Sequence, residues 1–264
     1  MLEACNQKPI YRSQADMTDL SINLNKIALI RNSREGNYPD VVEFAKVCID
    51  QGADGITVHP RPDQRHIRPD DVRRLAALVK PLTDVEFNVE GNPFAPAIGD
   101  YPGFIELVAE TIPDQCTLVP DGDDQLTSDH GFDLTSSGEQ LQPIIERLHS
   151  LGMRVSLFMD PDLAQIELAK EIGADRIELY TGPYAAAWGS DQLEPLFQQH
   201  LAAAELSTRL GMGVNAGHDL NLNNLAKFAS IPNLLEVSIG HAFTVDSLTL
   251  GMAQTVQRYK ALLG

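Results

Sequence analysis

The feature that most constrains the fold is a regular alternation of short apolar segments with longer segments of helical periodicity. The short segments are rich in β-branched residues, and Gly, Pro, Asp and Asn separate them from the longer ones. We expect strands at 20–22, 55–60, 85–91, 116–122, 154–160, 176–182, 213–219 and 235–242. We expect helices near 39–51, 69–80, 103–112, 138–150, 162–172, 191–210, 222–229 and 246–262.

This strand–helix order predicts an α/β protein with a parallel sheet, and eight units predict closure into a (β/α)8 (TIM) barrel. The chain has 264 residues, which is sufficient for such a barrel. The strand segments read as continuous apolar runs, as expected for a sheet covered on both faces. An open doubly wound sheet is the alternative, although no GxGxxG follows the first strand. We expect one catalytic domain over 20–264, preceded by an N-terminal arm over 1–19.

Composition and charge exclude several classes of partner. The formal net charge of −17 makes nucleic acid an improbable partner, and an anionic substrate would need its basic residues gathered locally. The first residues lack the basic and apolar parts of a secretory signal, and no apolar run is long enough to span a membrane. Three cysteines without paired spacing predict free thiols. We therefore expect a cytoplasmic protein that binds neither membrane nor nucleic acid.

Polar residues concentrate near the carboxyl ends of the expected strands. In barrels of this type the chemistry lies at that end, because the loops that follow the strands gather there. Polar groups on otherwise apolar strands are costly unless they are paired or functional. The residues concerned are Asn23, Asn25, Lys26, His59, Arg61, Glu86, Asn88, Glu90, Asp160, Glu178, Asn215, Gly217, His218, Asp219, Gly240 and His241.

The residue types at this end indicate acid–base chemistry on a phosphorylated substrate. His59, His218 and His241 converge on one face, and a single such histidine would more often be structural. Glu86 and Glu178 are flanked by apolar residues, so they are either bases with a raised pKa or members of internal ion pairs with Arg or Lys.

Two glycine-rich strand ends, NAGHD and SIGHA, stand where barrels commonly bind phosphate through backbone N–H groups. Arg34 and Arg61 supply guanidinium groups suited to phosphate oxygens. The sequence contains no HExxH motif and no Cys/His cluster, so we expect neither a metal nor another cofactor.

Several segments resemble the pyridoxine 5′-phosphate synthase family over about residues 20–262. They include SINLNKIALIRNSR (21–34), GADGITVHPRPDQRHI (52–67), VEFNVEGNP (85–93), VNAGHDL (214–220) and SIGHA (238–242). The resemblance implies a homo-octameric (β/α)8 barrel with extra helices. It also implies condensation of 3-amino-2-oxopropyl phosphate with 1-deoxy-D-xylulose 5-phosphate, which gives pyridoxine 5′-phosphate, inorganic phosphate and water.

The resemblance also implies a role for each matching residue. His59 and Glu86 match proton acceptors, His218 matches a proton donor, and Glu178 matches a transition-state stabiliser. The positions that match contacts to the deoxyxylulose phosphate are Arg61, His66 and Thr127, and those that match contacts to the amino-ketone phosphate are Asn23, Arg34, Gly240 and His241.

Three positions within the expected substrate site depart from the family pattern. Asn25 and Lys26 replace an Asp-His pair, and Asp219 replaces a glycine after the histidine of the seventh strand. Lys26 keeps a cation for phosphate binding but lacks a titrating imidazole. Asp219 brings a negative charge close to the expected phosphate pocket.

Two alternatives remain open from the residues alone. Another sugar-phosphate enzyme, such as an aldolase (lyase) or epimerase, would share the strand-end arrangement. A Schiff-base aldolase needs a lysine inside the barrel, and the only candidate, Lys26, follows the first strand. A non-catalytic barrel that senses a phosphometabolite would keep Arg34, Arg61 and the Gly-His ends but would not need Glu86 and Glu178.

Overall fold

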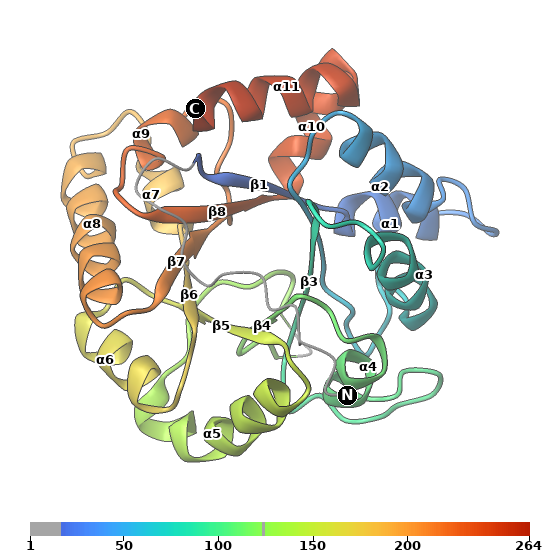
Figure 1. Ribbon diagram of the computed structural model, residues 1–264. Coiled ribbons are helices and arrows are strands. Elements are labelled where there is room, and N and C mark those ends of the chain that lie inside the picture. The colour runs from blue at the N-terminus through green and yellow to red at the C-terminus, as the bar shows by residue number, and fades with distance from the viewer. Residues whose placement is uncertain (1–16, 123–124) are drawn as a thin grey trace.

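Eight parallel strands form a closed barrel in chain order, from β1 beside β2 round to β8 beside β1 (Figure 1). The computed structural model describes residues 17–122 and 125–264, so most of the expected N-terminal arm lies outside the described residues. The predicted α/β barrel is confirmed. The strands are β1 (Asp19–Asn23), β2 (Gly55–Val58), β3 (Glu86–Gly91), β4 (Gln115–Leu118), β5 (Arg154–Met159), β6 (Arg176–Leu179), β7 (Gly213–Ala216) and β8 (Leu234–Ile239).

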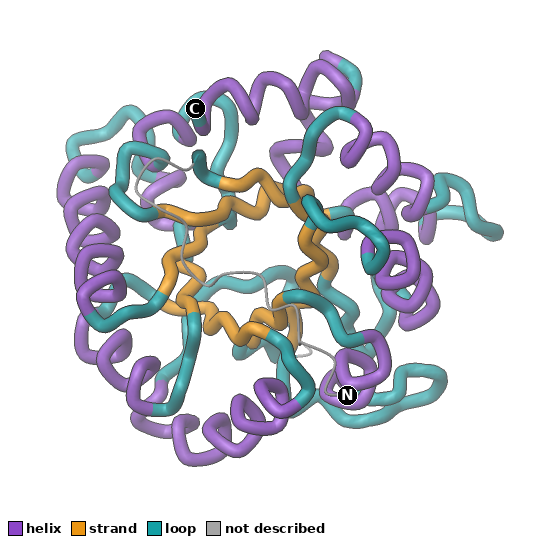
Figure 2. The backbone as a smooth tube through the Cα atoms, viewed as in Figure 1, coloured by secondary structure: helices purple, strands orange, loops and turns teal. Residues whose placement is uncertain are grey.

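Helices surround the ring of strands on all sides (Figure 2). Those that correspond to expected segments are α2 (Val41–Asp50), α3 (Pro69–Val79), α4 (Phe104–Thr111), α5 (Leu134–Ser150), α6 (Leu163–Glu171), α8 (Leu193–Arg209), α9 (Leu225–Phe228) and α11 (Met252–Leu263). The sequence pattern missed α1 (Asn25–Asn32), α7 (Gly182–Ala186) and the first half of α10 (His241–Leu250). The expected helix at 246–262 is divided between α10 and α11 because Gly251, at φ 80°, ends the first of them.

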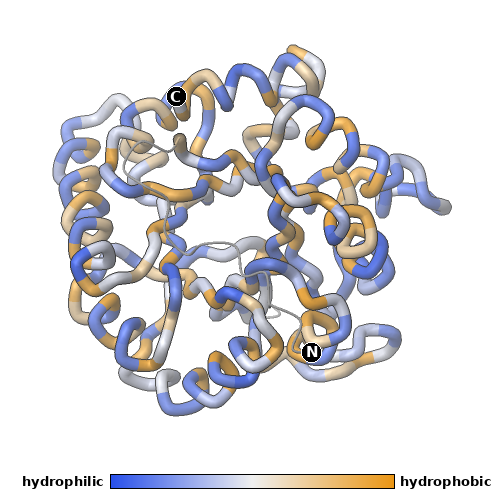
Figure 3. The backbone as a smooth tube through the Cα atoms, in the orientation of Figure 1, coloured by the Kyte–Doolittle hydropathy of each residue, from blue (hydrophilic) through white to orange (hydrophobic). Residues whose placement is uncertain are grey.

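The strands differ from the expected continuous apolar runs, because polar and apolar residues alternate along them (Figure 3). Apolar residues such as Ile22 and Val58 belong to the core between strands and helices. The intervening residues meet inside the barrel, where the Ser21 and Thr57 hydroxyl oxygens lie 2.7 Å apart and Thr117 donates to Asn88 Oδ1 at 3.0 Å. Polar groups are stable there because they satisfy one another's hydrogen bonds.

A charged cluster fills the amino end of the barrel. The Arg154 guanidinium forms an ion pair with Glu86 and donates from Nε to Gln115 Oε1 at 2.9 Å. Arg176 Nη1 lies 3.3 Å from Glu236 Oε2, and both of these side chains are buried. These ion pairs hold the strands together at the end opposite to the carboxyl ends.

None of the helices within residues 17–122 and 125–264 is both long and apolar enough to cross a membrane.

Candidate active site

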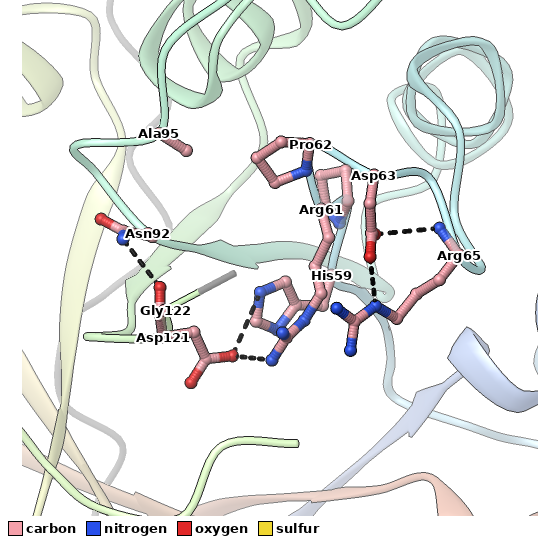
Figure 4. Close-up of a pocket in the computed structure, with 10 residues that line it drawn as sticks. His59, Arg61, Pro62, Asp63, Arg65, Asn92, Ala95, Asp121 and Gly122 are labelled. Atoms are coloured by element: carbon pink, nitrogen blue, oxygen red, sulfur yellow. Dashed lines mark hydrogen bonds and ion pairs between the residues drawn. The ribbon is translucent and has the colours of Figure 1, made fainter. Parts of the chain in front are cut away.

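His59, the residue that follows β2, lies between two carboxyl groups at the carboxyl end of the barrel. Its Nδ1 is 3.9 Å from Glu90 Oε2 and its Nε2 is 3.7 Å from Asp121 Oδ2. Both distances exceed the length of a hydrogen bond, although catalytic contacts often shorten only when substrate binds. Figure 4 shows the His59 ring directed at Asp121, within a small pocket that Arg61, Arg65 and Asn92 also line. The arrangement gives one imidazole two possible proton partners.

Glu90 is the carboxyl group that β3 presents at this end. Its side chain is buried and accepts a hydrogen bond from Asn23 Nδ2 at 3.3 Å. Burial raises the pKa of Glu90 well above its ordinary value, and the negative charges of Glu178, Glu236 and Asp121 raise it further. A carboxylate with a raised pKa is a stronger base than free glutamate, which suits it to proton transfer near neutral pH.

Glu86 lies away from this site, contrary to its expected position. Side chains two residues apart share a face of a strand, so residues 86, 88 and 90 all point into the barrel. Glu86 is level with Gly55 at the start of β2, and it is paired with Arg154 in the cluster at the amino end. At about 3.3 Å per residue it is some 13 Å along β3 from Glu90. The structure thus shows the internal ion pair that was the alternative interpretation of Glu86.

Two neighbouring imidazoles are kept neutral at physiological pH. Burial lowers the pKa of His59 to about 3, and the charges of Arg61 and Arg65 contribute. The pKa of His66 is also lowered to about 3, by burial first and then by His59 and nearby cations. Nδ1 of His66 accepts a hydrogen bond from Ile67 N at 2.9 Å, which places the ring proton on Nε2. His66 is therefore oriented as a donor, and His59 is a neutral imidazole with one acceptor nitrogen.

Arg61 connects this pocket to the loop after β4. Its guanidinium pairs with Asp121 and donates to the carbonyl oxygen of Gln125 at 2.9 Å. Ser128 Oγ also donates to Asp121 Oδ2, at 2.9 Å. Burial raises the pKa of Asp121, while Arg61 and Ser128 oppose that effect. The loop that carries Thr127 is thereby held over the barrel end.

His218, which follows β7, is fixed from several sides. Its Nε2 lies 2.9 Å from Thr127 Oγ1, and its Nδ1 lies 3.1 Å from Asp219 Oδ2. The Tyr180 ring meets it edge-on, with 5.4 Å between the ring centroids. The barrel end thus brings His218, which the resemblance matches to the proton donor, next to Thr127, which it matches to a contact with the deoxyxylulose phosphate.

Glu178 lies on the inward face of β6, and no hydrogen bond to its carboxyl group comes from any residue in the described parts of the chain. Burial raises its pKa to about 8, and Glu236 adds to the effect. At neutral pH this carboxyl group is therefore mostly protonated and can donate a hydrogen bond to a ligand.

The ends of β1 and β8 supply the remaining expected residues. Asn25 Oδ1 accepts from His59 N at 2.9 Å, so this asparagine orients the β2 end. Lys26 is close enough to His66 and Asp219 for its charge to lower the pKa of each. A side chain at Gly240 would meet that of Asn23 at 3.1 Å, which explains the small residue there. His241 is the first residue of α10 and is exposed, so the first turn of this helix lies at the carboxyl end of the barrel.

Arg34 is the expected substrate contact that stands apart. It is exposed beyond the end of α1, and it lines a surface hollow together with Arg68, Asp70 and Arg74. The structure does not bring it together with His59 and His66.

Sequence reasoning placed Glu90 among the polar residues near the strand ends without giving it a role, and it did not name Asp121. Glu90 lies four positions from Glu86 on the same face of β3, so the side-chain period of the strand alone does not distinguish the two. Asp121 comes just after the buried β4, which is the position that marks other site residues. Within residues 17–122 and 125–264 no group of three His, Cys, Asp or Glu side chains is arranged to hold a metal ion.

Comparison with known proteins places the chain in a family. A family profile described as "Pyridoxal phosphate biosynthesis protein PdxJ" matches residues 20–264. The chain belongs to the PdxJ family. Among PdxJ relatives, pyridoxine 5′-phosphate synthase from Xanthomonas campestris is 55% identical over 247 residues, which are 93% of this chain and 96% of the relative. The enzyme of that name from Xylella fastidiosa is 51% identical over 93% of this chain and 95% of the relative.

More distant solved structures share the PdxJ fold alone. KGPDC from Streptococcus mutans has a TM-score of 0.60 at 10% identity, with 94% of this chain and 98% of that chain covered. A protein from Aquifex aeolicus has a TM-score of 0.62 at 14% identity, with 95% and 94% covered. At such identities the likeness extends to the barrel and not to its chemistry.

Proposed function

We propose that this chain is a pyridoxine 5′-phosphate synthase of vitamin B6 biosynthesis. It would condense 3-amino-2-oxopropyl phosphate with 1-deoxy-D-xylulose 5-phosphate to give pyridoxine 5′-phosphate, phosphate and water. The observation that carries the proposal is neutral His59 between Glu90 and Asp121, in a chain 55% identical to a relative of that name. Ring formation needs repeated proton transfers and dehydrations, for which Glu90 and Glu178, whose pKa values are raised toward the neutral range, are suited.

The residues take the following roles in this proposal. His59 accepts protons, and Glu90 takes the acceptor role first expected of Glu86, because Glu90 is the carboxyl group that faces His59. His218 donates protons to leaving hydroxyl groups. Glu178, protonated below its pKa of about 8, donates a hydrogen bond to negative charge that develops on the substrate.

Two anion-binding regions flank these groups. Arg61, His66 and Thr127 surround the place proposed for the deoxyxylulose phosphate. Asn23, Gly240 and His241 lie where the first turn of α10 offers backbone N–H groups to the amino-ketone phosphate. Lys26 supplies a cation between the two regions, and Arg34 lies outside both of them, in the surface hollow beyond the end of α1.

The other candidate functions lack the matching residues. A Schiff-base aldolase needs a lysine that points into the barrel, and the described strands contain no lysine. A phosphometabolite sensor has no use for Glu90 and Glu178, two buried carboxyl groups that destabilise the fold when they ionise.

The direct test incubates the purified chain with 1-deoxy-D-xylulose 5-phosphate and freshly generated 3-amino-2-oxopropyl phosphate, without added metal. Pyridoxine 5′-phosphate, detected by mass and absorbance, is the expected product. A folded protein that binds either phosphate without turnover would instead favour the sensor.

We also propose a homo-oligomer in the cytoplasm, with the octamer of the resemblance as the expected state. Its support is a pair of contacting helices, α1 and α10, that expose Leu29, Ile30, Val245 and Leu248. Exposed apolar side chains grouped in this way commonly mark a protein interface. Light scattering at several concentrations gives the number of subunits, and a monomeric mass would refute the octamer.

A further inference from the structure

We propose that Asp219 is a positioning residue that sets the protonation of His218, rather than a contact to substrate phosphate. The inference rests on the proposed function, in which His218 is the proton donor. Asp219 Oδ2 lies 3.1 Å from His218 Nδ1, while Thr127 Oγ1 lies 2.9 Å from His218 Nε2. Carboxylate, imidazole and hydroxyl thus form a continuous chain at the mouth of the barrel.

The other neighbours of His218 hold its ring in place but do not determine which ring nitrogen carries hydrogen. The Thr181 hydroxyl donates to the carbonyl oxygen of His218, which holds the backbone. The rings of Tyr180 and Phe158 meet the imidazole at 69° and 64°. These contacts restrict where the ring lies, and Asp219 is the acceptor that decides which nitrogen carries hydrogen.

The backbone of Asp219 points to a function for its side chain. Its φ of 63° is in the left-handed region, where a residue with a Cβ costs on the order of 1 kcal/mol and glycine costs nothing. The turn itself is secured through the Asp219 carbonyl oxygen, which accepts from Asn221 Nδ2 at 3.3 Å and Asn224 Nδ2 at 3.2 Å. Glycine would satisfy this turn equally well, so the carboxyl group is present at a conformational cost, beside His218.

The charge of Asp219 suits this role. Its pKa is lowered, first by the hydrogen bond with His218 and then by the charges of His218, His241 and Lys26, so it is ionised throughout the neutral range. Asp121 from the β4 end and Tyr180 from the β6 end are further titratable groups near His218.

An ionised Asp219 keeps hydrogen on Nδ1 in both forms of His218. In the protonated ring, Nε2 also carries hydrogen and can give it to a leaving hydroxyl group of the substrate. That transfer breaks one N–H bond and forms one O–H bond, and it leaves a neutral ring that still donates from Nδ1 to Asp219. The carboxylate is unchanged at the end, so it orients and stabilises the donor without itself exchanging a proton.

Asp219→Gly and Asp219→Asn test the inference, because both replacements tolerate a positive φ and should leave the fold intact. With the glycine variant we expect kcat to fall by roughly 10- to 100-fold, less than the loss of an acid–base group itself. KM should change less than about 3-fold, since the substrate contacts remain. The alkaline limb of the kcat profile should move to lower pH, with the asparagine variant between glycine and wild type.

Nitrogen NMR of the His218 ring supplies a readout that does not depend on turnover. The wild type should carry hydrogen on Nδ1 across the neutral range, and the glycine variant should populate the Nε2–H form. This outcome decides the role of Asp219 even if the wild type makes no pyridoxine 5′-phosphate, which would count against the proposed function alone. An unchanged tautomer in the glycine variant, or a loss confined to KM, would overturn the inference and return Asp219 to substrate binding.

Discussion

Glu86 and Glu90 point to the same interior from β3, yet they serve opposite ends of the barrel. Glu86 is paired with Arg154 at the amino end, whereas Glu90 faces His59 at the carboxyl end. The sequence offers both as buried acidic residues on one strand, and only their register against β2 distinguishes them.

Replacing each of these glutamates by glutamine should therefore give opposite results. We expect Glu90→Gln to lower kcat by about 10²–10⁴-fold, because an acid–base group is lost, with little change in melting temperature. Glu86→Gln should retain kcat within about 3-fold but lose stability by roughly 3 kcal/mol, because it removes the ion-pair partner of the buried Arg154. Steady-state kinetics and thermal melts of the two variants decide the matter. A large kcat loss confined to Glu86→Gln would restore the original assignment.

The neutral histidines should make the fold sensitive to acid. The pKa values of His59 and His66 are depressed to about 3 in the folded chain, below the ordinary 6.5. Their contribution to stability is complete above pH 6.5 and is lost as the pH falls toward 3. The reason is that in this range the two histidines bind protons in the unfolded chain but not in the folded chain. His66→Gln should reduce this pH dependence by a few kcal/mol between pH 6.5 and 4 in denaturant titrations.

The control for this measurement is His130→Gln, since the His130 side chain is 54% exposed. The unfolding free energy of that variant should depend on pH as that of the wild type does. If His66→Gln loses stability toward acid as steeply as the wild type does, His66 is not held neutral by the fold.

Glu178 should have the opposite effect on the pH dependence of stability, with a loss of stability as the pH rises. Its pKa is raised from 4.5 to about 8, so the folded chain keeps a proton that the unfolded chain releases. The stabilisation is complete below pH 4.5 and is lost as the pH rises through 8, by roughly 3–5 kcal/mol in total. Glu178→Gln cannot ionise, so its unfolding free energy should rise relative to wild type between pH 5 and 8. Exposed Glu171→Gln is the matched replacement, and the difference from wild type should there stay constant with pH.

The order of strands and helices could be predicted because each unit carries its own local signal. Gly-rich turns end the helices and apolar runs mark the strands, so the barrel follows from patterns within about 30 residues. The polar interior could not be predicted, since the partner of Thr57 is Ser21 on one side and Asn88 on the other, each from a different strand. Helix α1 was missed because it begins only two residues after β1, with no turn residues between them.

The same distinction separates the site residues that were found from those that were not. His59 and His218 follow strands and Glu178 lies within the apolar run of β6, and these local positions were sufficient to select them. Choosing Glu90 over Glu86 required the register between β2 and β3, which depends on hydrogen bonds between strands. The outward position of Arg34 likewise depends on α1, which the sequence pattern did not indicate.

A buried ion pair supports the backbone at His66, and breaking this ion pair should lower the unfolding free energy strongly. Arg31 and Asp71 side chains are 0% and 4% exposed, with 2.5 Å between Nη1 and Oδ1, and Arg31 Nη2 donates to the His66 carbonyl oxygen at 2.9 Å. Asp71→Asn leaves the guanidinium charge buried without a counterion, so we expect a loss of about 3–5 kcal/mol in unfolding free energy. The double replacement Arg31→Met with Asp71→Leu removes both charges and should cost less than Asp71→Asn alone.

The exposed pair between Arg73 and Glu110 provides the comparison for this last prediction. Their side chains are 40% and 50% exposed, and solvent screens their attraction, so Glu110→Gln should cost less than about 1 kcal/mol. Urea titrations of the three variants measure the differences directly. Equal losses for Asp71→Asn and Glu110→Gln would mean that water reaches Arg31 in solution, and the His66 loop would then have to be held chiefly by the donation from Asn32 Nδ2 to the His66 carbonyl oxygen at 2.8 Å.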